Sequence, residues 1–157
     1  MVSLDRMDRR ILEVLQQEGG ISNLELAEKV GLSPSPCSRR VKQLEESGII
    51  ARQATLLDPV KLGLKLTAMI QISMDRHTPD RFENFEKTLE GYLEVISCCL
   101  ITGQAADYLL EVLVTDMESY QDFLLGKLTT IQGVTGVHSS FVLRKIIDRT
   151  SIPLTHL

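Results

Sequence analysis

The sequence predicts an α+β protein of two parts, and two observations support this. Up to about residue 60, hydrophobic residues recur at intervals of three and four, which indicates short helices. From residue 64 onward, hydrophobic and polar residues alternate, which indicates strands. We predict a helix-turn-helix domain of winged-helix-like type at 1–50, a linker at 51–63, and a ferredoxin-like β-α-β-β-α-β domain at 64–157.

Two helices with clear start and stop signals open the chain. Asp5 suits the N-cap of the first helix, and Gly19-Gly20 ends it. The second helix begins at Ser22, which together with Glu25 has the S-x-x-E form of a capping box. Gly31 ends this helix and provides the turn before the next one.

The third helix begins with the unusual stretch Ser33-Pro34-Ser35-Pro36. Ser33 suits an N-cap, and both prolines fall in the first turn, where backbone N–H groups have no partner within the helix. The prolines therefore fix the start of the helix and do not break it. Gly48 ends the helix. Its inner side is predicted to carry Cys37, Val41 and Leu44.

The second half of the chain gives four strands and two helices. The first predicted helix runs from Thr78-Pro79 to Gly91, and the second begins at Asp116. Its inward residues are predicted to be Met117, Tyr120, Leu124, Leu128 and Ile131. The predicted strands are 64–74, about 95–102, about 108–115 and about 137–147. This order is the split β-α-β pattern of ferredoxin-like domains.

Two helices can cover only one face of such a sheet. The strands near 95–102 and 108–115 are nevertheless hydrophobic on both faces, so the open face requires another surface. A second copy of the chain is the simplest source of such a surface, so we expect a homodimer. Cys98 and Cys99 lie in this hydrophobic run and are predicted to be buried.

Composition limits the classes of protein that fit. Of 157 residues, 43% are hydrophobic and 24% charged, and the net charge is −4. The sequence shows no signal peptide and no hydrophobic run near the ~18 residues of a membrane span. Three cysteines fit a reducing cytoplasm better than a disulfide framework. The three histidines are scattered, so we expect no metal site and no cofactor.

The third helix is the candidate for nucleic-acid binding. Between residues 29 and 44 there are four basic residues and no acidic one. On charge alone, a solvated helix face and a DNA-binding face fit equally well. The capping box, the turn and the proline start favour a DNA-binding helix-turn-helix. The residues predicted to contact double-stranded DNA are Ser33, Ser35, Ser38, Arg39, Arg40, Lys42 and Gln43.

Nearly the whole chain resembles the Lrp/AsnC (feast/famine) family of transcriptional regulators. The resemblance is carried by "LDRMDRRILEVLQQEGGISNLELAEKVGLSPSPCSRRVKQLEESGII", by "TGQAADYLLEV" and by "IQGVTGVHSSFVL". It implies a DNA-binding regulator whose C-terminal domain, 64–157, binds a free amino acid and mediates oligomerisation. It also implies dimers that pair through their sheets and assemble into octamers.

The resemblance also indicates where the amino-acid effector would bind. The family pattern G-x-x-D-Y corresponds here to Gly103–Tyr108, in which either the loop is one residue longer or the glycine is shifted by one position. Without the resemblance, a plain hairpin turn is the favoured interpretation of this loop. The predicted effector contacts are Thr102, Gly103, Gln104, Ala105, Ala106, Asp107, Tyr108, Gln132, Gly133, Val134, Thr135, Ser139 and Ser140.

The chemistry of the loop suggests the kind of amino acid. Asp107 lies between hydrophobic stretches, and a carboxylate buried there without a partner would be costly, so an ammonium group is the expected partner. Ala105 and Ala106 cannot hydrogen-bond a polar side chain, which favours leucine or methionine. Gln104 and Gln132 could hydrogen-bond a polar side chain, so a polar effector is the alternative.

Enzyme function is not predicted, since no G-x-S-x-G, P-loop or H-E-x-x-H motif is present. The alternative is an amino-acid-binding allosteric module that regulates an enzyme and does not bind DNA. Salt-dependent binding to duplex DNA would distinguish the two.

Overall fold

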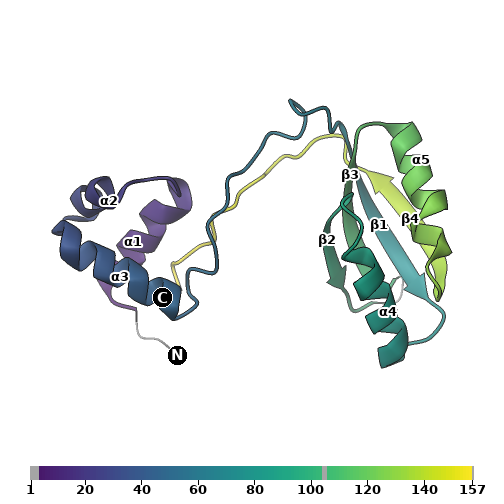
Figure 1. Cartoon of the computed structure of the whole chain (residues 1–157), viewed down its shortest axis with the longest axis horizontal. Helices are drawn as coiled ribbons and strands as arrows, with labels where there is room; N and C mark the ends of the chain where they lie inside the picture. The colour runs from purple at the N-terminus through teal and green to yellow at the C-terminus, as the bar shows by residue number, and fades with distance from the viewer. Residues whose placement is uncertain (1–3, 104–105, 157) are drawn as a thin grey trace. The chain divides into compact units, whose positions relative to one another are not determined.

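The computed structural model describes residues 4–103 and 106–156, and the chain forms two compact units (Figure 1). The N-terminal unit comprises Met1–Leu56 together with Ile146–Leu157, and the sheet unit comprises Leu57–Lys145. The predicted α+β class, with a helix-turn-helix followed by a ferredoxin-like domain, is confirmed. Across the described ranges, none of the helices has both the length and the hydrophobicity to cross a membrane.

Three helices form the N-terminal unit: α1 (Arg6–Gln17), α2 (Asn23–Val30) and α3 (Pro34–Glu46). The predicted capping box of α2 is present, with Ser22 and Glu25 exchanging hydrogen bonds. Asp5 caps α1 as predicted, and Asp8 completes a second capping box there. The core of this unit is made of Ile11, Leu12, Leu26, Ala27, Val30, Cys37 and Leu44.

The turn between α2 and α3 depends on a left-handed residue and a cross-helix bond. Gly31 has φ of 75°, a conformation that glycine adopts without steric cost. Ser33 occupies the N-cap position of α3, but its hydroxyl forms no cap hydrogen bond. The Asn23 side-chain amide instead donates to the Pro34 carbonyl at 2.9 Å. The start of α3 is therefore fixed by α2 and by its two prolines.

The C-terminal segment returns to the N-terminal unit, which differs from the predicted boundaries. The Gln16 side chain accepts a hydrogen bond from the Ile152 N–H at 2.7 Å and donates to the Ile152 carbonyl at 3.3 Å. Leu154 packs on the helical core. The last strand ends at Phe141, earlier than the predicted residue 147, and the chain from Ile146 onward belongs to the N-terminal unit.

We expect Gln16→Ala to loosen this attachment. The change removes two hydrogen bonds, each contributing about 0.5–1.5 kcal/mol, so the free energy of unfolding of the N-terminal unit should fall by ~1–3 kcal/mol. Hydrogen exchange of the α1 amides would measure it. Gln17→Ala, at the exposed neighbouring position, is the matched control. Equal protection in the two variants would contradict the proposed anchoring.

The sheet unit has the element order predicted from the alternation of residues. Its elements are β1 (Leu66–Met74), α4 (Pro79–Leu89), β2 (Val95–Leu100), β3 (Tyr108–Val114), α5 (Met117–Gly126), a short 3₁₀ turn (Leu128–Thr130) and β4 (Val134–Phe141). The strands are antiparallel in the order β2-β3-β1-β4. Strands β3 and β1 are therefore central and pair on both sides, as in a ferredoxin-like domain.

Helices α4 and α5 cover one face of the sheet. Phe85 and Leu89 of α4, and Tyr120 and Phe123 of α5, pack in one core with the alternate residues of β1 and β3. For α5, one residue predicted to point inward is exposed, and one buried residue was not predicted. Met117 is 53% exposed because it lies at the first helical position, and Phe123 takes a buried place that had not been predicted.

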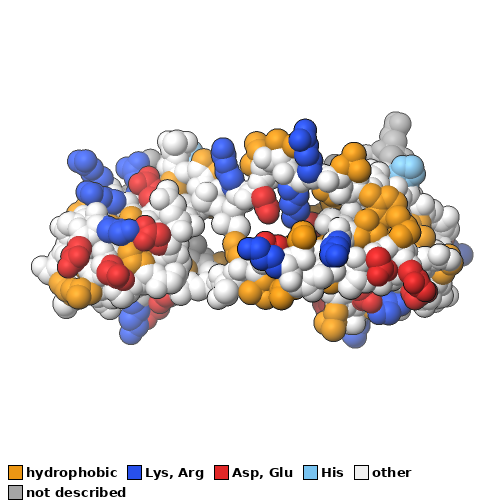
Figure 2. Space-filling model, turned by 90° about the horizontal axis from the view of Figure 1, so that it is seen from above, with side chains coloured by type: hydrophobic (Ala, Val, Ile, Leu, Met, Phe, Trp, Pro, Cys, Tyr) orange, Lys and Arg blue, Asp and Glu red, His pale blue; other side chains and the backbone are white. Residues whose placement is uncertain are grey.

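The other face of the sheet has no helix. Its residues on β1 and β3 are only half-buried, and those of the edge strand β2 are almost all exposed. Cys98 and Cys99 are exposed, so the prediction that the single chain buries them is wrong: β2 has a neighbour on one side only. Hydrophobic side chains come to the surface in several places on this unit (Figure 2).

Candidate DNA-binding surface and effector site

Helix α3 turns a polar face to solvent. Cys37 and Leu44 are buried against the other helices, with Val41 half-buried between them. The residues on the opposite side of the helix are exposed, namely Ser35, Ser38, Arg39, Lys42 and Gln43. Lys42 lies 3.6 Å from Glu46 in an exposed pair, which solvent weakens. This face therefore presents hydroxyl, amide and cationic groups, which are the groups that contact phosphates and base edges.

The first turn of α3 offers few backbone donors to a phosphate. Pro34 and Pro36 have no N–H, and the Cys37 N–H is bonded to the Ser33 carbonyl. The Ser35 N–H remains in this turn, beside the exposed hydroxyl groups of Ser33 and Ser35. Phosphate binding at this helix end must therefore depend on side chains more than on backbone amides.

Arg40 differs from the other predicted DNA contacts. Its Nη1 lies 2.7 Å from Asp5 Oδ2 and 2.7 Å from Asp8 Oδ1, and its side chain is only 29% exposed. The hydrogen bonds to Asp8 and then Asp5 raise the pKa of Arg40. The pKa of Asp5 is lowered, first by the backbone N–H of Asp8 and also by Arg40. The structure therefore pairs Arg40 with α1 and separates it from the exposed face.

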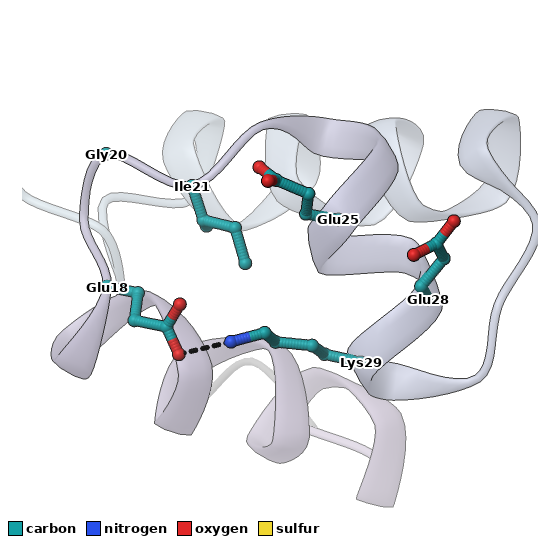
Figure 3. Close-up of a pocket in the computed structure, with 6 residues that line it drawn as sticks. All are labelled: Glu18, Gly20, Ile21, Glu25, Glu28 and Lys29. Carbon is teal, nitrogen blue, oxygen red and sulfur yellow. Dashed lines mark hydrogen bonds and ion pairs between the residues drawn. The ribbon is translucent and has the colours of Figure 1, made fainter.

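A hollow between the end of α1 and α2 is unsuited to DNA (Figure 3). Glu18, Glu25 and Glu28 line it, and the one lysine there, Lys29, is paired with Glu18 at 2.5 Å. This arrangement would repel phosphate groups. Lys29, which opens the basic stretch of the sequence, thus lies away from the candidate face of α3.

Asp107 has partners within the chain, whereas the sequence suggested only the ammonium group of an effector as its partner. Its Oδ2 accepts a hydrogen bond from the Met74 N–H at 2.7 Å, and its Oδ1 lies 2.8 Å from His77 Nε2. Its backbone N–H donates to the Ile72 carbonyl and its carbonyl accepts from the Ile101 N–H, both at 2.8 Å. Asp107 therefore ties the hairpin loop to the end of β1.

The second predicted effector segment meets the same end of β1. The Asp75 N–H donates to the Gly133 carbonyl at 2.8 Å, and the Thr135 hydroxyl donates to the Ser73 carbonyl. Gly133 has φ of 99°, and a Cβ there would lie 3.1 Å from the Asp75 carboxylate. Arg81 pairs with Asp75 at 3.4 Å. We name this region the sheet-end site, comprising Asp75, His77, Arg81, Asp107 and Gly133.

Three other predicted effector residues point elsewhere. Tyr108 is buried under α4, where its hydroxyl donates to Glu86 at 2.7 Å, and burial followed by this bond raises its pKa. The Ser139 hydroxyl accepts a hydrogen bond from Tyr120 on the helix side of the sheet. Ser140 is exposed and alternates with Ser139, so it lies on the open face.

The remaining predicted contacts surround the sheet-end site or lie outside it. Ala106 is buried next to Asp107, whereas Thr102, Gly103 and Gln132 are exposed and Val134 is half-buried. Gln104 and Ala105 lie outside the described residues. Sequence reasoning missed Asp75, His77 and Arg81. The charged run directly after the alternating strand was the available signal for them.

Among the described residues, no group of three or more His, Cys, Asp or Glu side chains is placed to hold a metal ion.

Comparison with known proteins identifies both domains. The Lrp/AsnC ligand binding domain model matches residues 67–152, and a winged helix-turn-helix DNA-binding model matches residues 4–51. The chain is 40% identical to the Bkd operon transcriptional regulator of Pseudomonas aeruginosa over 98% of this chain and all of that protein. It is also 40% identical to the leucine-responsive regulatory protein of Escherichia coli K12, covering 91% and 87% of the two chains.

Solved structures agree. A transcriptional regulator of Neisseria meningitidis in complex with L-methionine has a TM-score of 0.94 at 45% identity, covering 98% of this chain and 99% of that one. E. coli AsnC has a TM-score of 0.87 at 27% identity, covering 97% and 100%. The relatives from P. aeruginosa, E. coli K12 and N. meningitidis are named as regulators. With matched models over both of its domains, the chain belongs to the Lrp/AsnC family of DNA-binding, amino-acid-responsive transcriptional regulators.

Proposed function

We propose that this regulator binds duplex DNA through the exposed face of α3 and that methionine or leucine, bound at the sheet-end site, controls its activity. The single observation that carries the proposal is that both effector segments predicted from the family converge on the end of β1. There, Asp107 bonds Met74 and Gly133 bonds Asp75. Binding to chromosomal DNA places its action in the cytoplasm.

The sheet-end site carries the two charges that a free amino acid requires. The Asp107 carboxylate is 19% exposed, and its Oδ1 faces His77, whose side chain is 68% exposed and can move aside. An ammonium group could take the place of the imidazole. Arg81 carries a guanidinium suited to a carboxylate, although it is now paired with Asp75.

The hydrophobic surroundings favour an aliphatic side chain. Met74 and Ala106 are buried beside the site, and Phe82 stacks on the His77 ring with 6.0 Å between ring centroids. The structural relative from N. meningitidis contains L-methionine, and another relative is named as leucine-responsive. We therefore expect methionine and leucine to bind more tightly than asparagine.

We also propose that the chain forms homodimers through the open face of the sheet, and that the dimers assemble further into octamers. The half-buried side chains of this face would be covered by the same face of a second copy. A ligand held between dimers would then link amino-acid binding to assembly.

The effector proposal predicts a clear response in isothermal calorimetry and thermal unfolding. A hundredfold excess of L-methionine over its Kd should stabilise the protein by about 2.7 kcal/mol. Asp107→Asn keeps an acceptor for the Met74 N–H but loses the charge, so methionine should bind at least about tenfold more weakly. DNA affinity without methionine should be unchanged.

His77→Ala is the matched control, because it removes the other partner of Asp107. It should bind methionine as tightly as the unaltered protein, or more tightly. If Asp107→Asn binds methionine with unaltered affinity, Asp107 is a turn residue only. If the unaltered protein binds duplex DNA without salt dependence, the alternative of a module that does not bind DNA is favoured.

A further inference from the structure

Arg40 and Arg39 are adjacent and identical in type, but the structure gives them different surroundings. Arg39 is exposed on the polar face of α3. Arg40 lies three residues after buried Cys37 and four before buried Leu44, so it belongs to the inner side of the helix. Its guanidinium meets the first turn of α1.

The two partners of Arg40 are also held by hydrogen bonds of their own. Asp5 Oδ1 accepts the N–H groups of Met7 and Asp8 at 2.8 Å, and Asp8 Oδ2 accepts the Asp5 N–H at 3.1 Å. The other oxygen of each carboxylate binds Arg40. Each carboxylate therefore serves the capping box of α1 and α3 at the same time, with Asp8 only 15% exposed.

The charge balance opposes a phosphate contact by Arg40. One guanidinium is shared between two carboxylates, so the cluster of Asp5, Asp8 and Arg40 carries a net negative charge. A phosphate approaching it would meet repulsion from both aspartates. Lys42, by contrast, is 72% exposed, and its one ion pair, with Glu46 at 3.6 Å, is exposed to solvent.

We infer that Arg40 is a positioning residue for DNA binding: it holds α3 against the capping box of α1 and makes no phosphate contact itself. This inference rests on α3 being the DNA-facing helix. Buried Cys37 and Leu44 hold α3 on the core of the N-terminal unit. The ion pairs of Arg40 fix the position of α3 relative to the N-terminus of α1. Without the pairs, the polar face could shift relative to base edges, where small displacements are costly.

The two roles predict opposite effects for Asp8→Asn, which makes a sharp test. Each variant of the full chain would be titrated with a duplex selected by the unaltered protein from a random pool, over a range of salt concentrations. As a positioning residue, Arg40 requires Asp8, so Arg40→Gln and Asp8→Asn should both weaken binding by about tenfold, the size of one misplaced base contact. The slope of log K against log salt should stay unchanged in both.

The double variant Arg40→Gln/Asp8→Asn should bind no more weakly than Arg40→Gln alone, because both changes remove the same interaction. As a phosphate contact, Arg40→Gln would flatten the salt slope by about 0.9, and Asp8→Asn would tighten binding by freeing the guanidinium. That result would overturn the inference.

Circular dichroism and urea unfolding would confirm that each variant is folded during the titration. If Arg40→Gln lowers the stability but leaves the affinity of the folded protein unaltered, Arg40 is a structural residue only and the inference fails. Arg39→Ala provides the separate check on α3 itself: a flattened salt slope there shows that α3 meets DNA even if the inference on Arg40 fails.

Discussion

Replacing both Arg39 and Lys42 by alanine is expected to weaken DNA binding more than any other change. Both side chains are exposed on the polar face of α3. Removing one phosphate contact should flatten the slope of log K against log salt by about 0.9, so removing two should flatten it by about 1.8. If Arg39 also binds guanine through two hydrogen bonds, discrimination between bases should fall by about 1–3 kcal/mol. Fluorescence anisotropy over a salt series would measure both effects.

The double variant Arg10→Ala/Lys29→Ala is the matched control, because it removes the same number of positive charges from the N-terminal unit. Arg10 donates to the Lys29 carbonyl, and Lys29 is paired with Glu18 away from the candidate face. Its salt slope should remain close to that of the unaltered protein. Equal flattening in the two double variants would show that only net charge matters, and would remove α3 from the interface.

Leu109→Glu should have the largest effect on assembly. Leu109 is half-buried on the open face of β3, where it lies opposite Gln71 of β1 and Cys99 of β2. A carboxylate at the centre of a face-to-face sheet contact would be buried without a partner, which costs several kcal/mol. Sedimentation should then show the 17.6 kDa monomer in place of a dimer or larger assembly.

Leu125→Glu serves as the control for this change. Leu125 is 58% exposed on α5, which covers the opposite face of the sheet. The same substitution there should leave the assembly intact. A protein that sediments as a monomer before any substitution would contradict the proposed dimer, and a Leu109→Glu variant that remains dimeric would place the interface elsewhere.

Local patterns in the sequence were sufficient for the elements. Alternation predicted β1 and a hydrophobic run predicted β3, each to within two residues, and the cap residues Asp5 and Ser22 set the starts of α1 and α2. These signals act over three or four residues, so a single sequence contains them. The ends of β4 and α5 were predicted too late in the chain, because their hydrophobic pattern continues into a tail and a turn.

The candidate sites depend on partners that are distant in sequence. Nothing near Arg40 distinguishes it from Arg39, since Asp5 and Asp8 lie 35 and 32 residues away. The bond from Met74 to Asp107 spans 33 residues. Such pairs become visible only once packing brings the elements together. The sequence therefore indicated the segments of the candidate sites, but not which of their side chains are already paired within the chain.

Because the C-terminal segment returns to the helix-turn-helix unit, the chain has the topology of one domain inserted into another. Both ends of the chain belong to the helix-turn-helix unit, and the sheet unit is the insertion between Leu56 and Ile146. The chain therefore passes between the two units twice, once after Leu56 and once before Ile146. After a nick in the 51–63 segment, the non-covalent contacts of Ile152 and Leu154 would be what joins the two pieces, and a fragment truncated at residue 50 would lack these contacts. A fusion partner attached to the C-terminus would join the DNA-binding half of the molecule.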